Sequence, residues 1–171
     1  MRAAALRRLT QLLCAGAMLA GTGLAAADTA ERSRTQSLQS SRELAQEARA
    51  SIRELPAAEL SARLQKNPEL LLVDVRTERE YLAGHLSGAD WIPRGKLEFV
   101  IANKDLPADH EIVLYCRTGA RAALAARALQ DMGYRNVSSL EGGFKQWTVD
   151  GNSIYNQHGE IRVLEFEAVE E

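Results

Sequence analysis

The chain has 171 residues, of which 46% are hydrophobic and 26% are charged, a balance typical of a globular protein with a packed core. Its 21 Lys and Arg residues against 23 Asp and Glu residues give a formal net charge of -2, and aromatic residues make up only 5%. These values argue against nucleic acid as the main partner. Two cysteines exclude a disulfide scaffold, and the length fits one domain with an extra segment at an end.

The first 27 residues have the pattern of a secretory signal peptide. Arg2, Arg7 and Arg8 precede an uncharged apolar run at 12–24, which ends in Ala25-Ala26-Ala27. The run is short and rich in small residues, so a retained membrane anchor is the less favoured alternative. We therefore expect cleavage after residue 27, a periplasmic location in a Gram-negative cell, and no membrane span in the mature protein.

Cleavage at this point changes the charge and the cysteine content. It removes three arginines and leaves 18 Lys and Arg against 23 Asp and Glu, a net charge of -5. Cys14 is also removed, and a lipid anchor at Cys14 is disfavoured because Leu13 stands where a lipobox has a small residue. The mature protein then holds Cys116 as its single cysteine, which is either buried and inert or functional.

Residues 28–51 form a polar lead-in segment. The segment is rich in Ser, Arg, Gln, Glu and Ala, has no aromatic residue and carries only a thin apolar stripe at Leu38, Leu44, Ala45 and Ala48. This composition predicts a solvated helix or a flexible segment, and a partner-binding helix is the alternative.

The packed domain is expected at 52–154, followed by an acidic tail at 155–171. Pro56 starts the first helix and Asn67-Pro68 ends it. Two continuous apolar runs, at 70–75 and 111–115, predict strands that are buried on both faces of a parallel sheet.

The remaining elements are short. We expect helices at 78–82 and 97–101, strands at 89–92 and 136–140, a helix with Leu124, Ala125, Ala128, Leu129 and Met132 on one face that ends at Gly133, a last helix anchored by Phe144 and Trp147, and an extra strand around Ile161, Val163 and Leu164. Strands that alternate with helices predict an α/β fold, a three-layer sandwich with a small, mainly parallel sheet.

The loop Cys116-Arg117-Thr118-Gly119-Ala120-Arg121 carries the candidate chemistry. It follows a buried strand and precedes a helix, at the sheet edge where open α/β proteins bind ligands. A short loop with a glycine can turn its backbone N–H groups inward as an anion nest, and Arg117 and Arg121 add positive charge. This setting favours Cys116 as a thiolate nucleophile. A buried, inert cysteine is the alternative, and it leaves the glycine and the arginines unexplained.

Three ordered motifs resemble the rhodanese superfamily. They are Leu71-Leu72-Val73-Asp74-Val75-Arg76 with Glu80-Tyr81, Gly84 to Ala89 and Ile92-Pro93, then the loop Cys116 to Arg121, and finally Leu140 to Phe144 with Trp147 and Gly151. The resemblance covers about 52–154, one whole domain. Trp91 and Ser153 depart from the family pattern and concern the shape of the pocket.

The resemblance implies a sulfurtransferase of the thiosulfate type, and together with the expected signal peptide it predicts an exported, single-domain enzyme. Cys116 takes a sulfane sulfur from thiosulfate or a similar donor as a persulfide and passes it to cyanide or a thiol. The backbone amides of Arg117, Thr118, Gly119, Ala120 and Arg121 cradle the outer sulfur and the anionic donor. No metal or organic cofactor is expected.

Charged residues in the loop and at the end of the strand at 70–75 are expected to support the site. Arg121 either binds the donor anion or holds the loop by pairing with Asp74, and we favour the structural role for both. Arg76 is expected to support the end of its strand. Arg117 either meets the donor at the mouth of the pocket or is a solvated surface residue.

Two other functions remain open. A persulfide carrier or partner-binding module is suggested by residues 28–51 and by the acidic tail, and we expect deletion of 28–51 to abolish partner binding in a carrier but to spare the rate of an independent enzyme. An oxyanion reductase or phosphatase is disfavoured. Those enzymes place five residues between cysteine and arginine, whereas four separate Cys116 from Arg121.

Overall fold

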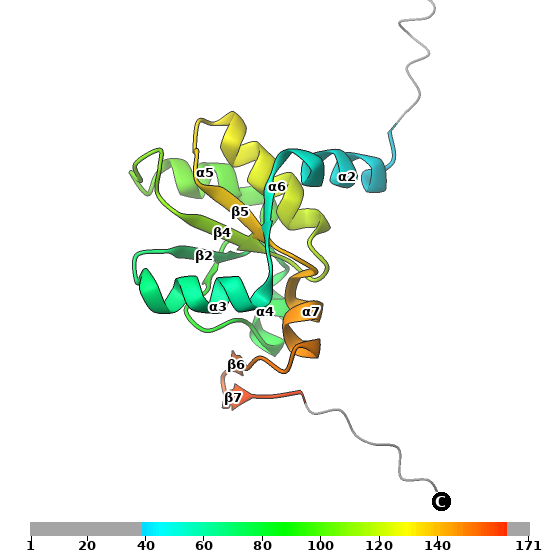
Figure 1. Cartoon of the computed structure of the whole chain (residues 1–171), viewed down its shortest axis with the longest axis vertical. Coiled ribbons are helices and arrows are strands. Elements are labelled where there is room, and N and C mark those ends of the chain that lie inside the picture. Colours follow the sequence, from blue (N-terminus) through cyan, green and yellow to red (C-terminus); the bar gives the residue numbers. More distant parts are fainter. Residues whose placement is uncertain (1–38, 164–171) are drawn as a thin grey trace, which may run out of the picture. The chain divides into compact units, whose positions relative to one another are not determined.

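A five-stranded sheet forms the centre of the protein in the computed structural model, which describes residues 39–163 (Figure 1). The order of the strands is β1-β5-β4-β2-β3, and every pairing in this sheet is parallel. The strands are β1 (Arg53–Leu55), β2 (Leu71–Asp74), β3 (Asp90–Trp91), β4 (Ile112–Tyr115) and β5 (Val137–Leu140). The predicted α/β fold with a parallel sheet is confirmed.

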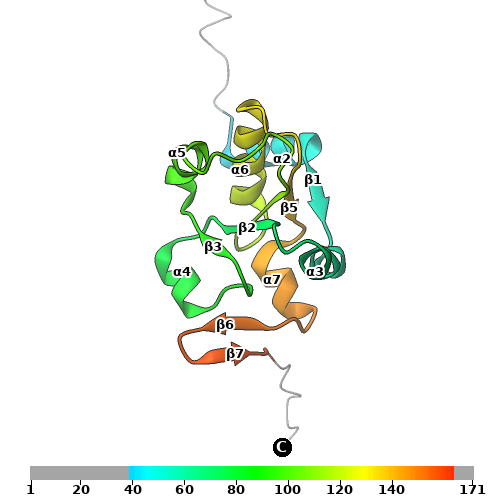
Figure 2. The same ribbon diagram turned by 90° about the vertical axis from the view of Figure 1, so that its left-hand side faces the viewer.

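Helices cover both faces of this sheet. They are α2 (Ser41–Ser51), α3 (Ala57–Lys66), α4 (Glu78–Ala83), the 3-10 turn η1 (Arg94–Lys96), α5 (Leu97–Ala102), α6 (Ala120–Asp131) and α7 (Gly143–Val149). Figures 1 and 2 show α5 and α6 on one face and α3 and α7 on the other. The sandwich therefore has the three layers that the sequence predicted.

The two faces are apolar because side chains alternate along each central strand. Val73 and Leu114 pack in the cluster beneath α5 and α6, whereas Leu72 and Val113 pack in the cluster with α3 and α7. Both β2 and β4 thus lie buried on two sides, as their continuous apolar runs predicted.

Helix α6 buries Ala125 and Leu129 of the expected face but also residues beside it, and Met132 is not buried. Ala122, Ala123, Ala125, Ala126 and Leu129 are buried, while Met132 is 43% exposed. The prediction for Met132 was wrong because the helix ends at Asp131 and Met132 is its C-terminal cap.

Strand β1 was not recognised in the sequence. It has three residues, only Leu55 is buried, and Pro56 caps the next helix immediately afterwards. The strand exists because it pairs with β5 at the edge of the sheet, with Leu55 opposite Leu140. So short a segment has no periodicity of its own to reveal it.

Helix α2 lies in the segment expected to be a solvated helix or a flexible lead-in. A capping box between Ser40 and Glu43 begins it, and Ala45 and Ala48 are buried where it packs against α6. The segment expected to be a signal peptide and residues 28–38 lie outside the described residues.

After α7, strands β6 (Ile154–Asn156) and β7 (Gly159–Ile161) pair as an antiparallel hairpin. Backbone hydrogen bonds between His85 and Tyr155 attach the hairpin to the turn after α4. Ile161 belongs to β7, Val163 does not, and the acidic residues from 164 onward lie outside the described part. Between residues 39 and 163, no helix combines the length and the apolar character that a bilayer span requires.

Candidate active site

Cys116 lies directly after β4, and three residues later Gly119 caps the N-terminus of α6. Gly119 has a φ of 93°, a left-handed conformation that side-chain-bearing residues rarely adopt. The side chain of Cys116 is 1% exposed, so the sulfur is recessed at the carboxyl edge of the sheet. This is the strand-loop-helix position that the sequence predicted.

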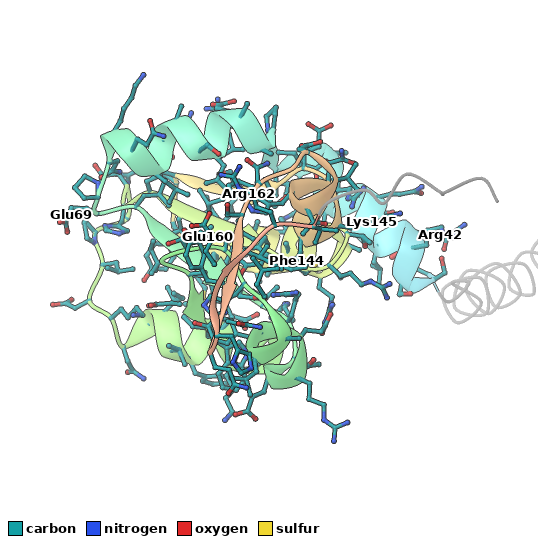
Figure 3. All side chains as sticks on the ribbon, turned by 90° about the horizontal axis from the view of Figure 1, so that it is seen from below. Arg42, Glu69, Phe144, Lys145, Glu160 and Arg162 are labelled. Carbon is teal, nitrogen blue, oxygen red and sulfur yellow. The ribbon has the colours of Figure 1, made fainter. Side chains whose placement is uncertain are left out.

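Helix α7 supports one side of the loop (Figure 3, Phe144 and Lys145 labelled). The N–H of Phe144 donates to the carbonyl of Cys116 at 2.8 Å, and that of Lys145 donates to the carbonyl of Arg117 at 3.0 Å. Gly143 allows this approach, because a Cβ there would lie 2.4 Å from the carbonyl oxygen of Cys116 and 2.9 Å from the nitrogen of Gly119. The glycine turn at the start of α7 is therefore part of the site.

Helix α2 supports the loop from another direction. Arg49 Nη2 donates to the carbonyl of Thr118 at 2.6 Å, and Arg49 Nε lies 3.7 Å from Glu54 Oε1. A Cβ on Gly119 would lie 2.6 Å from Arg49 Nη2. Arg49 was not predicted as a site residue, because nothing in the sequence distinguishes an arginine of a polar helix from a solvated one.

Arg121 pairs with Glu80 of α4 and not with Asp74, so the predicted pairing was wrong. Its two terminal nitrogens donate to the two Glu80 oxygens at 2.8 and 3.0 Å. Hydrogen bonds from Arg121 lower the pKa of Glu80 to about 2 against the opposing effect of burial. Glu80 raises the pKa of Arg121 against the opposing effect of burial, and the side chain of Cys116 raises it further.

Asp74 pairs instead with Arg76, two residues further along. Asp74 is fully buried and Arg76 is 3% exposed, with Arg76 Nη2 2.6 Å from Asp74 Oδ2. Burial disfavours the charge on Arg76, but the hydrogen bonds and the charge of Asp74 outweigh it and raise the pKa of Arg76. Because Arg76 turns back on the end of β2, the carboxylate of Asp74 already has a partner and Arg121 does not need to provide one.

Arg76 links this pair to the cysteine loop. Its guanidinium donates to the carbonyl of Gly84 at 2.6 Å and lies 4.0 Å from the centre of the Phe144 ring. Phe144 in turn bonds to the carbonyl of Cys116. The expected support of the strand end by Arg76 thus extends to the Cys116 loop, through the ring of Phe144 and the backbone N–H of the same residue.

The other predicted site residues lie on the open side of the loop. The side chains of Arg117 and Thr118 are exposed, and Ala120 is half-buried. Within the described part of the chain, Arg117 makes no ion pair. In the same range, no three His, Cys, Asp or Glu side chains gather closely enough to hold a metal ion.

A cavity of about 560 Å³ opens beside the loop, between α2 and the first turns of α6. Its wall includes Arg49, which contacts the cysteine loop, and Arg121, which is the last residue of that loop. The site therefore has a recessed sulfur and an adjoining space with cationic groups.

The family model of the rhodanese-like domain matches residues 56–150. The chain belongs to the rhodanese-like family. The match contains the sheet strands β2 to β5, the cysteine loop, Asp74, Arg76 and Gly143. Helix α2 and Arg49 lie before it.

Relatives of this rhodanese-like protein include named sulfurtransferases. A sulfurtransferase of Allochromatium vinosum is 34% identical over 108 residues, which are 63% of this chain and 99% of that protein. The thiosulfate sulfurtransferase GlpE of Stutzerimonas stutzeri is 34% identical over 86 residues, 50% of this chain and 77% of the relative. Larger relatives are matched over only 23 to 27% of their length.

A solved structure shares the fold of this rhodanese-like domain. It is a Rhodopseudomonas palustris protein described as a possible tyrosine phosphatase, with 32% identity and a TM-score of 0.59, over 67% of this chain and 92% of that one. The comparisons together place the protein among rhodanese-like domains with sulfurtransferase relatives.

Proposed function

We propose that this protein is a sulfurtransferase that carries a sulfane sulfur as a persulfide on Cys116, with thiosulfate or a similar anion as donor and a thiol as acceptor. One observation carries the proposal: a recessed cysteine follows β4 in a loop that α2 and α7 brace and that ends in Arg121 at the start of α6. An inert core cysteine requires none of these contacts.

The proposed reaction consists of two sulfur transfers that need only the donor, Cys116 and the acceptor. The Cys116 thiolate attacks the outer sulfur of thiosulfate, the S–S bond of the donor breaks, and sulfite leaves with the electron pair. The thiolate of the acceptor then attacks the outer sulfur of the persulfide, and Cys116 leaves as thiolate. The charge of Arg121 and the partial positive end of α6 favour the anionic groups in both steps.

A phosphatase or oxyanion reductase fits the loop less well. Four residues separate Cys116 from Arg121, and Arg121 is already engaged by both oxygens of Glu80. The guanidinium is thus not free to grip a tetrahedral oxyanion as a bidentate donor. Hydrolysis of an aryl phosphate by this protein would contradict the assignment.

The persulfide test uses intact-mass spectrometry of the protein after mixing with thiosulfate, beside Cys116→Ser. We expect a gain of one sulfur atom on the unaltered protein and none on the variant, and cyanide should then release thiocyanate. If thiosulfate and polysulfide both leave the mass unchanged, the sulfurtransferase proposal fails.

A carrier role needs a different test from the deletion of residues 28–51. That deletion removes Arg49 and its bond to Thr118, so an independent enzyme would also lose rate. Deletion of residues 28–38 spares α2 and separates the two hypotheses. If the protein is a carrier that docks through this segment, the shortened protein no longer transfers sulfur to its partner. If it is an independent enzyme, the shortened protein keeps its rate of sulfur transfer to cyanide.

We also propose that the protein is exported and cleaved after residue 27. The basic start, the apolar run and the three alanines support this proposal. Intact mass of the protein from the periplasmic fraction should correspond to a chain that starts at Asp28. A chain that keeps its first residues in a membrane fraction would contradict it.

A further inference from the structure

The cavity between α2 and α6 has one wall that lies outside the rhodanese-like match. That wall comes from α2, and the opposite wall comes from the start of α6, next to the cysteine loop. Its volume of about 560 Å³ falls in the range of small-molecule sites and far exceeds what thiosulfate or cyanide needs. The space is thus suited to a larger molecule than the simplest sulfur donors.

The polar groups of the cavity are mainly cationic. Arg42, Arg49 and Arg121 line it together with the amide of Gln46. Arg49 is committed to the carbonyl of Thr118 and Arg121 to Glu80. Arg42 is exposed on the first turn of α2 (Figure 3), and no hydrogen bond or ion pair joins its side chain to another described residue. It is therefore the guanidinium available for an anionic ligand.

Apart from Ser41, the remaining lining is apolar. It consists of Ala45 on α2 and of Ala120 and Leu124 on α6. Small side chains leave room for an organic group, while the arginines supply positive charge at the polar side. A carboxylate-bearing organic molecule matches both features.

We infer that this cavity binds the carboxylate-bearing part of a small organic thiol or of its persulfide, with Arg42 as the specificity-determining cation. The inference rests on the proposed function, because Ala120 and Arg121 belong both to the lining of the cavity and to the end of the loop that begins at Cys116. As acceptor, the thiolate takes the outer sulfur and Cys116 leaves as thiolate. As donor, the organic persulfide gives its outer sulfur to the Cys116 thiolate and leaves as thiolate.

Binding is tested without turnover. Calorimetric titration of S-methylglutathione into the Cys116→Ser protein should show saturable binding, and Arg42→Gln should raise Kd about fivefold to tenfold through loss of a charge-assisted hydrogen bond. Arg135→Gln is the matched control. Arg135 is exposed and precedes β5, so it lies at the amino-terminal end of the parallel strands, whereas Cys116 follows the carboxyl end of β4. Equal Kd values for Arg42→Gln and Arg135→Gln would overturn the inference, as would binding no tighter than that of S-methylcysteamine.

Transfer rates distinguish the two roles of the ligand. With Cys116 loaded by thiosulfate, Arg42→Gln should slow discharge to glutathione at least fivefold more than discharge to 2-mercaptoethanol if the ligand is an acceptor. If it is a donor, the same ratio should appear between loading from glutathione persulfide and loading from thiosulfate. A ratio near one in both experiments contradicts the inference. If Cys116 gains no sulfur at all, the proposed function fails instead, and the calorimetric titration alone then tests whether the cavity binds the ligand.

Discussion

Gly143 shows how a single residue sets the shape of the cysteine loop. Its φ is 63°, and its missing side chain lets the start of α7 touch the carbonyl of Cys116. Gly151 also has a positive φ, of 75°, but a Cβ at that position would meet no other atom within 4 Å. Comparison of the two glycines therefore separates backbone strain from contact with the loop.

We predict that Gly143→Ala slows persulfide formation on Cys116 about tenfold or more, because the loop must shift to admit the methyl group. Gly151→Ala incurs similar backbone strain, about 1 kcal/mol, and should keep the rate. Stopped-flow loading with thiosulfate measures the rate, and urea unfolding measures stability. Equal rates in the two variants would show that the contact between Gly143 and the loop is dispensable.

Glu80 makes the stability of the protein depend on pH. Its pKa is about 2 in the folded protein against an ordinary value of 4.5, because Arg121 donates hydrogen bonds to the carboxylate. A lowered pKa means that the ion pair stabilises the fold above about pH 4.5 and that this contribution is lost as the pH falls toward 2. Since the pair is partly exposed, solvent screening limits it to about 1 kcal/mol.

We predict that Glu80→Gln lowers the free energy of unfolding by about 1 kcal/mol at pH 7 and that the difference from the unaltered protein shrinks as the pH falls below 4.5. Urea unfolding between pH 7 and pH 2.5 measures it. Asp131→Asn is the control, because its pair with Arg127 lies on the exposed surface of α6. A difference that stays constant down to pH 2.5 would contradict the ion-pair assignment.

At the scale of elements, α2 belongs to the site although it precedes the family match. Its buried Ala45 and Ala48 hold it against α6, and this contact brings Arg49 to the carbonyl of Thr118. The helix needs its partner, since an isolated helix of eleven residues is marginal in water. Packing on α6 therefore decides both its stability and its effect on the loop.

We predict that Ala48→Glu displaces α2 and slows persulfide formation several-fold, because a charged side chain cannot be accommodated in the α2–α6 contact. Ala50→Glu adds the same charge at an exposed position of the same helix and should keep the rate. Circular dichroism establishes that the central sheet persists in both variants. An unaltered rate in Ala48→Glu would exclude α2 from the function of the loop.

At the scale of the whole molecule, one parallel sheet separates two apolar clusters. Trp147 belongs to the cluster on the α3 and α7 face, while Trp91 lies on the edge strand β3 and donates to the carbonyl of Arg76. Because the central strands contribute side chains to both clusters, neither side can lose its packing alone.

We predict a single cooperative unfolding transition that both tryptophans report. In Trp91→Phe the fluorescence comes from Trp147, and in Trp147→Phe it comes from Trp91. Within each variant the urea midpoint by fluorescence should coincide with that by circular dichroism. Separate midpoints would show that the edge at β3 unfolds before the rest of the sheet.

The sequence by itself determined the α/β class, the buried strands β2 and β4, and the cysteine loop after β4. Each of these depends on neighbouring residues: the continuous apolar runs at 70–75 and 111–115, and a glycine close to a cysteine before a helix. Such local patterns specify the backbone conformation of a segment and which of its side chains will be buried when the elements pack. The loop around Cys116 could therefore be predicted from the sequence alone.

Only the tertiary structure decided what holds that loop in place. Arg121 pairs with Glu80 at 41 residues' separation, and Arg49 reaches Thr118 at 69 residues' separation. Several acids could have paired with either arginine, and packing of α4 and α2 beside the loop selected these partners. Strand β1 exists for the same reason, because its three residues become a strand only against β5. Contacts between distant segments depend on how the elements pack, which no local pattern contains.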